Sequence, residues 1–257
     1  MGIINTTPDS FYQKSRFQDS DSLMNQVSQM VTEGVDIIDV GGYSSRPGAM
    51  NISVDEEISR VIPAIKKIHE KFPNLLISID TFRSGVAVEA LKAGASIIND
   101  ISGGVQDEAI FKVAADLHAP YILMHMQGTP QTMSAQTNYE NLMKDILFYF
   151  SNQIAKAKAA GIKDLILDPG FGFSKTIDQN FELLNNLNQL EIFGLPILAG
   201  LSRKSTIYKT LNISAEESLN GTTVMNTIAL MKGASILRVH DVKEAKQAIQ
   251  LISKLSW

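Results

Sequence analysis

The sequence contains no cysteine among its 257 residues, and this absence excludes several kinds of chemistry. Without a thiol the chain forms no disulfide, holds no zinc through thiolates and uses no cysteine nucleophile. Histidine is also scarce, with four residues, and His69 and His118 fall in helical patterns where we expect them at the surface. A reducing compartment suits this composition, and we expect a cytoplasmic protein.

The chain also lacks an excess of positive charge and any long apolar run. Lys and Arg total 23 against 27 Asp and Glu, which leaves a net charge of −4 and predicts no nucleic-acid partner. No apolar stretch approaches the ~18 residues of a membrane span, so we expect no membrane association. Walker-type phosphate loops and the His-Glu-x-x-His zinc motif are missing. The glycine-rich segment 170–175 departs from a dinucleotide fingerprint at Lys175, where that motif needs glycine.

Eight short apolar runs organise the chain, and a polar side chain or a glycine follows each of them. The runs are residues 2–4, 36–40, 76–79, 96–98, 121–124, 165–167, 197–199 and 236–237. Helical periodicity predicts helices over residues 22–33, 54–71, 84–93, 107–117, 139–160, 179–190, 215–232 and 243–255. Eight β-then-α units without a linker predict an α/β fold, a (β/α)₈ TIM barrel in which residues 1–257 form a single domain.

The long polar connections at 6–21 and 41–53 follow the first two predicted strands. Most connections of this type need only a few residues. Long ones over the catalytic face of a barrel are typical of lids, and we expect that role here.

Four polar side chains follow different predicted strands and can therefore face one cavity. They are Asp80, Asn99, Asp168 and Lys204. A carboxylate can accept two parallel N–H donors from a 2-amino-4-oxo-pyrimidine edge, while an ammonium donates to its carbonyl oxygen. Each acid alone is better explained as a helix cap, a satisfied strand end or a solvated surface residue than as part of a site. Their joint placement indicates a binding site for a flat heterocycle.

A second set of residues has the chemistry of an anion site. It comprises Asn5 with Thr6, the run Ser44-Ser45-Arg46, and Arg238 with His240. Arginine offers paired donors to phosphate oxygens, and hydroxyls with backbone N–H groups complete such a cradle. The amide oxygen of Asn5 is a ligand type that Mg²⁺ accepts, although this ion usually keeps waters and substrate phosphates as its main ligands.

Three further features leave room for more than one interpretation. Segment 200–205 predicts a turn that opens toward a helix N-terminus, and Lys204 within it is also compatible with a Schiff-base nucleophile. His125 follows the fifth run, where we expect a structural neighbour rather than a catalyst. The methionine-rich stretch 124–133 is expected to line the pocket or the core, not to bind a metal.

Several motifs resemble those of the bacterial dihydropteroate synthases, and they follow that family's order along essentially the whole chain. The opening stretch 1–11 and segment 41–48 resemble the family's two signatures. Further matching motifs lie at 79–81, 98–103, 168–173, 202–205 and 238–242. Chance agreement at all of these positions is not credible.

The resemblance implies condensation of hydroxymethyl-dihydropterin pyrophosphate with p-aminobenzoate, which yields 7,8-dihydropteroate and pyrophosphate. It implies a homodimer that requires Mg²⁺ and a site at which sulfonamides compete. The pterin site implied is Asp80, Asn99, Asp168 and Lys204, with Met124 and Gly200 lining it. The pyrophosphate and Mg²⁺ site implied is Asn5, Ser45, Arg46, Arg238 and His240. The residues implied around p-aminobenzoate are Phe11, Pro47, Phe173, Arg203 and Ser205.

Two positions depart from the family's pattern. Ser45 stands where threonine is usual, and the hydroxyl is kept. Tyr43 replaces a small or acidic residue, which leaves the shape of the second connection open.

We expect an SN1-like substitution in which Asp80, Asp168, Lys204 and Arg238 form the catalytic set. Pyrophosphate departs first, and the carboxylates stabilise the cation left on the pterin methylene before the aromatic amine attacks. A corrinoid-type pterin methyltransferase, a lysine-dependent aldolase and a non-catalytic pterin binder are the rival interpretations. The first would not need the Arg238 and His240 anion site, and the last predicts losses at catalytic positions that are not found.

Overall fold

Eight parallel strands form one sheet whose order follows the sequence from β1 to β8. The computed structural model describes residues 1–6, 16–44 and 51–255, with only the backbone of 16–20. The strands are β1 Gly2–Asn5, β2 Ile37–Gly41, β3 Leu76–Asp80, β4 Ile97–Asp100, β5 Tyr121–Met124, β6 Leu165–Asp168, β7 Ile197–Ala199 and β8 Ala234–Leu237. Because parallel neighbours need a crossover, each strand is followed by a helical connection.

The sheet closes on itself between its last and first strands. Ile3 N donates to Val239 O at 3.0 Å, and Val239 N donates to Met1 O at 2.9 Å. The buried amino group of Met1 adds a bond of 2.9 Å to Leu237 O. These bonds satisfy the edges that an open sheet would expose, and the predicted (β/α)₈ barrel is confirmed.

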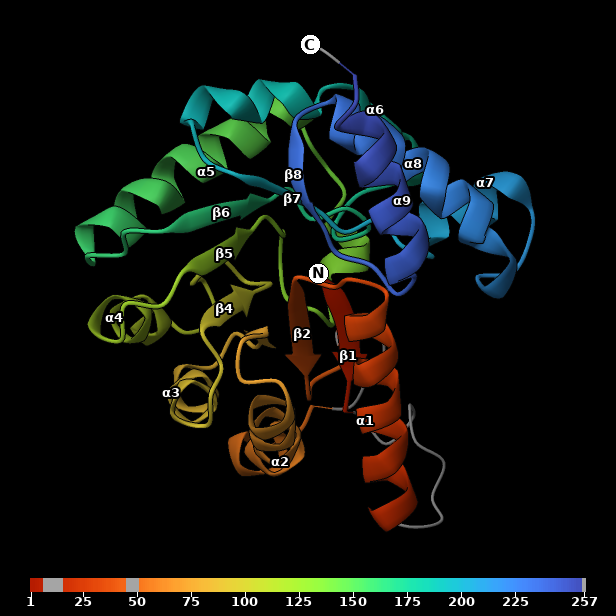
Figure 1. Ribbon diagram of the computed structural model, residues 1–257. Helices are drawn as coiled ribbons and strands as arrows, with labels where there is room; N and C mark the ends of the chain where they lie inside the picture. The colour runs from red at the N-terminus through yellow and green to blue at the C-terminus, as the bar shows by residue number, and fades with distance from the viewer. Residues whose placement is uncertain (7–15, 45–50, 256–257) are drawn as a thin grey trace.

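Helices surround the strands on the outside (Figure 1). They are α1 Arg16–Thr32, α2 Val54–Lys71, α3 Ser84–Lys92, α4 Ala109–Asp116, α5 Leu142–Ala159, α6 Ile177–Asn185, α7 Ser205–Leu211, α8 Leu219–Met231 and α9 Val242–Ile252. Side-chain caps begin several of them; Ser53 accepts from Glu56 N at the start of α2. Within the described residues, no helix combines the length and the apolar character that crossing a membrane requires.

Two helical predictions were wrong in detail, and one short helix lay outside the predicted ranges. Helix α1 begins at Arg16, not Ser22, because residues 16–21 contain one apolar residue, Phe17, and therefore show no apolar period. The predicted helix 179–190 is divided into α6 and the 3₁₀ segment η3, Leu187–Phe193. The predicted turn at 200–205 does open into a helix, α7, but the extent of this helix was not predicted, since seven residues are too few to show a helical period.

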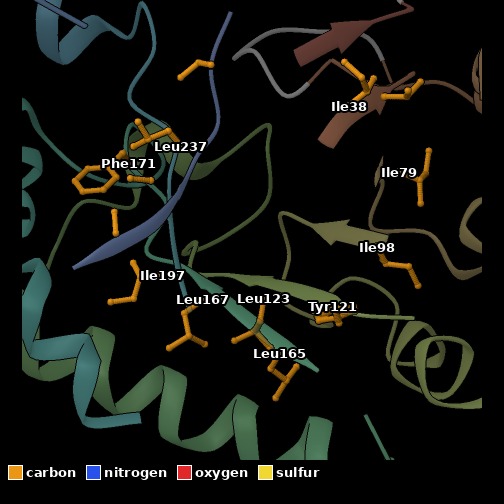
Figure 2. Close-up of a cluster of buried hydrophobic side chains, with 14 of the residues drawn as sticks. Ile38, Ile79, Ile98, Tyr121, Leu123, Leu165, Leu167, Phe171, Ile197 and Leu237 are labelled. Atoms are coloured by element: carbon orange, nitrogen blue, oxygen red, sulfur yellow. The ribbon is translucent and has the colours of Figure 1, made fainter. Parts of the chain in front are cut away.

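Side chains alternate between two apolar environments along each strand. One set points outward to the helices, and Figure 2 shows Leu165 and Leu167 directed from β6 in this way. The other set fills the barrel interior with Met1, Ile97, Ile122 and Leu198, against which Ile37, Ile166 and Ile236 pack. Burying each such side chain contributes on the order of 1.5–3 kcal/mol. Because these apolar side chains fill the interior, the polar residues of the cavity lie above them, at the carboxyl ends of the strands.

Candidate functional site

A cavity of about 450 Å³ lies at the carboxyl ends of the strands. The residues lining it are Ile3, Asn5, Tyr43, Ser44, Asp80, Asn99, Ile101, Met124, Asp168, Phe173, Gly200, Ser202, Arg203, Lys204, Arg238 and His240. The barrel thus brings together most of the sequence-predicted site. Phe11, Ser45, Arg46 and Pro47 lie outside the described residues.

Arg238 joins two carboxylates at the cavity. It follows β8 directly; its Nε lies 2.6 Å from Asp39 Oδ2 and its Nη2 lies 2.7 Å from Asp80 Oδ2. Asp39 was missed by the sequence analysis because it lies inside an apolar run. The sequence does contain a signal for Asp39, which is an acidic residue within an apolar run. Burying an acid in a strand is costly unless a cation or hydrogen-bond donors accompany it, so such an acid indicates a partner.

The Asp80 carboxyl at the end of β3 faces the cavity in a poorly solvated position. Burial raises the pKa of Asp80 to about 7, against the lowering effect of Arg238. The negative charges of Asp39, Glu57 and Asp100 add to the rise of this pKa. A carboxyl with this pKa changes its protonation state within the physiological range.

Asp168 and Lys204 lie on the opposite side of the barrel mouth, where each charge acts on the pKa of the other. Asp168 Oδ1 accepts from Gly170 N at 2.8 Å, and burial raises the pKa of Asp168 against the opposing effect of Lys204. Lys204 Nζ donates to Phe171 O and lies 4.9 Å from the centre of the Phe173 ring. Burial lowers the pKa of Lys204 to about 8, and Asp168 opposes the change. Lys204 is therefore largely an ammonium at neutral pH.

The orientation of the Asn99 amide follows from its partner. Asn99 Nδ2 donates to Asp39 Oδ2 at 3.0 Å. Its Oδ1 is buried and has no hydrogen-bond partner among the described residues. Since Asn99 lines the cavity, this oxygen is an acceptor without a protein donor, and a ligand N–H would satisfy it.

His240 and Ser202 lie beside Arg238. Ser202 Oγ accepts from His240 N at 3.2 Å and lies 3.0 Å from His240 Nδ1. The hydroxyl proton is thus free for Nδ1, which leaves the ring proton on Nε2. Burial, with the charge of Arg238, lowers the pKa of His240 to about 4. His240 is therefore neutral at physiological pH and carries a ring proton that it can donate to a ligand.

Of two residues expected around p-aminobenzoate, Arg203 lines the cavity and Ser205 does not. Arg203 lines the cavity, but its guanidinium is held by Asp241 at 2.8 and 3.0 Å and by the carbonyls of Ala215 and Glu216. Ser205 begins α7 and is not among the residues that line the cavity. The backbone of Arg203 is left-handed, with φ +54°, and its side chain is directed to Asp241.

An apolar wall completes the cavity. Met124, Met126, Met133 and Ile101 form a buried cluster against which Phe82 and Phe173 pack. The expectation that the methionine-rich stretch lines pocket or core is therefore confirmed. Tyr43 contributes another aromatic surface, edge-on to Phe82 at 5.2 Å, and Gln131 Nε2 donates to its hydroxyl.

A buried lysine supports the loop after β6. Lys175 Nζ lies 3.0 Å from His125 Nδ1 and donates at 3.1 Å to Gly170 O and Phe173 O. Burial lowers the pKa of Lys175 to about 7 and that of His125 well below its ordinary value. His125 is also packed edge-on against Tyr149 at 4.8 Å, so it is a structural neighbour of the site.

The donor set at Asn5 allows only limited metal binding by the protein. Asn5 ends β1 and lines the cavity. Within the described residues, no three His, Asp or Glu side chains are grouped to hold a metal ion. One amide oxygen fits an ion that keeps most of its waters and phosphate ligands, as Mg²⁺ does, and does not fit a resident zinc site.

Comparison with known proteins places this geometry in context. The profile of the family described as pterin binding enzyme matches residues 1–240. The dihydropteroate synthase of Clostridium beijerinckii is 47% identical over 254 residues, which cover 98% of this chain and 91% of that protein.

Two solved structures share the fold over nearly the whole chain. Dihydropteroate synthase from Clostridium difficile, determined in the presence of pteroic acid, has a TM-score of 0.92 and 40% identity, covering 98% of this chain and 94% of its own. The Xanthomonas albilineans enzyme with 4-aminobenzoic acid has a TM-score of 0.92 and 35% identity, covering 100% and 93%.

Proposed function

The chain belongs to the pterin-binding enzymes, among the dihydropteroate synthases, and we propose how its own residues perform that family's condensation. The substrates are 6-hydroxymethyl-7,8-dihydropterin pyrophosphate and p-aminobenzoate, and the products are 7,8-dihydropteroate and pyrophosphate. The observation that carries the proposal is one cavity with Asp80, Asn99, Asp168 and Lys204 beside Arg238 and His240. The solved relatives that hold pteroic acid and 4-aminobenzoic acid support this assignment.

The pterin ring is held by complementary donors and acceptors. The carboxylates of Asp80 and Asp168 and the free Oδ1 of Asn99 accept from ring and amino N–H groups. The Lys204 ammonium donates to the ring carbonyl. Met124 and Gly200 line the pocket, and the open side of Gly200 leaves space between Lys204 and Arg238.

The reaction is an SN1-like substitution. The C–O bond between the pterin methylene and the diphosphate breaks first, with both electrons leaving on pyrophosphate. Arg238 and the neutral His240 donate to the departing oxygens. The cation on the methylene is delocalised into the ring and stabilised by Asp80 and Asp168. The p-aminobenzoate amine then attacks and releases one proton, for which no strong base is needed.

Phe173 borders the cavity where we place p-aminobenzoate. The family resemblance alone assigns further residues to the same substrate: Phe11, Pro47, Arg203 and Ser205. It likewise assigns Ser45 and Arg46 to the diphosphate. We propose Mg²⁺ as the cofactor, with Asn5 as its protein ligand and the diphosphate as its main one. When bound, the ion would offset negative charge on the leaving group.

We further propose a homodimer and a cytoplasmic location, with residues 1–257 forming one domain. The face of α8 that carries Val224, Ile228 and Met231 leaves these apolar side chains partly exposed, and α9 adds Leu251. Helices α8 and α9 pack together, so a second copy of the chain could cover both.

The direct test is to mix purified protein with the pterin pyrophosphate, p-aminobenzoate and Mg²⁺ and to follow dihydropteroate by chromatography. Stoichiometric dihydropteroate and pyrophosphate support the proposal. A protein that binds pterin but forms neither product would contradict it. Treatment with borohydride and the substrates should leave Lys204 unmodified, whereas trapping would favour the aldolase.

A further inference from the structure

Asp39 is a buried carboxylate that serves two residues of the site without lining the cavity. It lies in the middle of β2 with no exposed surface. The register places it opposite Ile3 on β1 and Ser78 on β3, one layer below Asp80. An acid at such a depth costs several kcal/mol unless its partners compensate, so its partners indicate its role.

One oxygen of Asp39 receives both partners. Oδ2 accepts from Arg238 Nε at 2.6 Å and from Asn99 Nδ2 at 3.0 Å. The contact with Nε orients the guanidinium plane, so that Nη2 reaches Asp80 at 2.7 Å. The contact with Nδ2 turns the Asn99 amide so that its oxygen is left for a ligand donor. The two contacts with Asp39 therefore fix the orientation of the Arg238 guanidinium and of the Asn99 amide.

We propose that Asp39 is the positioning residue of this site, which orients Arg238 toward the leaving diphosphate and Asn99 toward the pterin. The inference rests on the proposed condensation for its functional meaning. Asp39 contacts no substrate in it and acts through these two side chains. Its effect resembles that of partners that orient metal ligands, whose loss costs about 10- to 100-fold in affinity or activity.

The charge of Asp39 also acts on Asp80 through the shared guanidinium. The charged groups around Asp80 include Arg238, which lowers its pKa, and Asp39, Glu57 and Asp100, which raise it. Lys204 also faces Asp80, whose charge raises the pKa of that lysine. Without the charge of Asp39, Asp80 is the remaining carboxylate that pairs with Arg238, and the repulsion between the Asp39 and Asp80 carboxylates is removed. The pKa of Asp80 should therefore fall, and the acid limb of the pH profile should move to lower pH.

The test compares Asp39→Asn with the control Ser78→Ala. Ser78 lies opposite Asp39 in the register, is equally buried, and its Oγ has no hydrogen-bond partner among the described residues. Asp39→Asn should lower kcat/KM by about 10- to 100-fold, shift the acid limb downward and weaken pyrophosphate binding in calorimetry. Ser78→Ala should leave the kinetic constants and the limb unchanged.

The outcomes separate this inference from the proposed function. An unmodified protein that forms no dihydropteroate contradicts the function, while the calorimetric comparison still tests Asp39. A folded Asp39→Asn protein with unchanged pyrophosphate affinity, or with lower kcat but an unshifted limb, overturns the positioning role. If Asp39→Asn does not fold, the test is the NMR resonance of the Arg238 Nε–H in the unmodified protein. This resonance is assigned by its loss in Arg238→Lys. Slow exchange with solvent supports the inference, and rapid exchange overturns it.

Discussion

Arg238 Nη2 lies 2.7 Å from Asp80 Oδ2 and joins the eighth strand to the third across the barrel mouth. In the proposed condensation this pair sets a ligand of the leaving group beside a carboxylate that binds the pterin. Each charge then has a separate partner in the proposed reaction: Arg238 faces the diphosphate that leaves, and Asp80 faces the cation that remains.

Replacing Asp80 by Asn should lower kcat by about 100-fold or more and change pterin affinity far less. The reason is that the cation exists only after pyrophosphate departs, so the charge of Asp80 acts mainly in the transition state. Single-turnover rates and calorimetry with a diphosphate-free pterin measure the two effects. Asp164→Asn, an exposed acid before β6, is the control. A drop confined to affinity would count against charge stabilisation.

The pH dependence of kcat/KM for the pterin substrate should be bell-shaped, with limbs near pH 7 and pH 8. The pKa of Asp80 is raised to about 7 by burial, so its carboxylate is lost as the pH falls below that value. The pKa of Lys204 is lowered to about 8 by burial, so its ammonium is lost as the pH rises above that value. Asp80→Asn should remove the acid limb and Lys204→Arg the alkaline limb. Limbs that persist in both variants would refute the assignment.

Gly170→Ala should destabilise the protein by at least about 3 kcal/mol. An added Cβ would lie 2.1 Å from the His125 carbonyl oxygen, and φ is +71°. Gly194 is the matched control, since its φ is +61° but a Cβ there meets nothing within 4 Å. Gly194→Ala should cost about 1 kcal/mol from backbone strain alone. Urea unfolding measures both, and equal losses would show that the close contact is unimportant.

A double substitution of Val224→Glu with Met231→Glu should convert the proposed homodimer to a monomer. Both side chains lie on the exposed apolar face of α8, and two buried charges in each copy would oppose association. Sedimentation velocity at several concentrations gives the oligomeric state. Phe148→Glu alters an exposed apolar residue on α5 and should leave the dimer intact. A dimer unaffected by the double substitution places the interface elsewhere.

The sequence by itself determined the barrel and the membership of its site. Apolar runs of fixed length, each ending in a polar residue and followed by a helical period, predict strand order and the face on which functional groups gather. Asp80, Asn99, Asp168, Lys204 and Arg238 were predicted in this way. Their placement at one cavity follows from their local position at or just after the end of a strand, which the order of residues along the chain shows.

Only the tertiary structure decided which side chains pair and which charges survive. Asp39 looked like one residue of an apolar run, but closure of the barrel places it against Arg238, 199 residues away. The neutral state of His240 and the binding of Arg203 to Asp241 likewise depend on neighbours distant in sequence. Hydrogen-bond partners and pKa shifts arise from burial and proximity in three dimensions, and no local pattern of residues encodes these quantities.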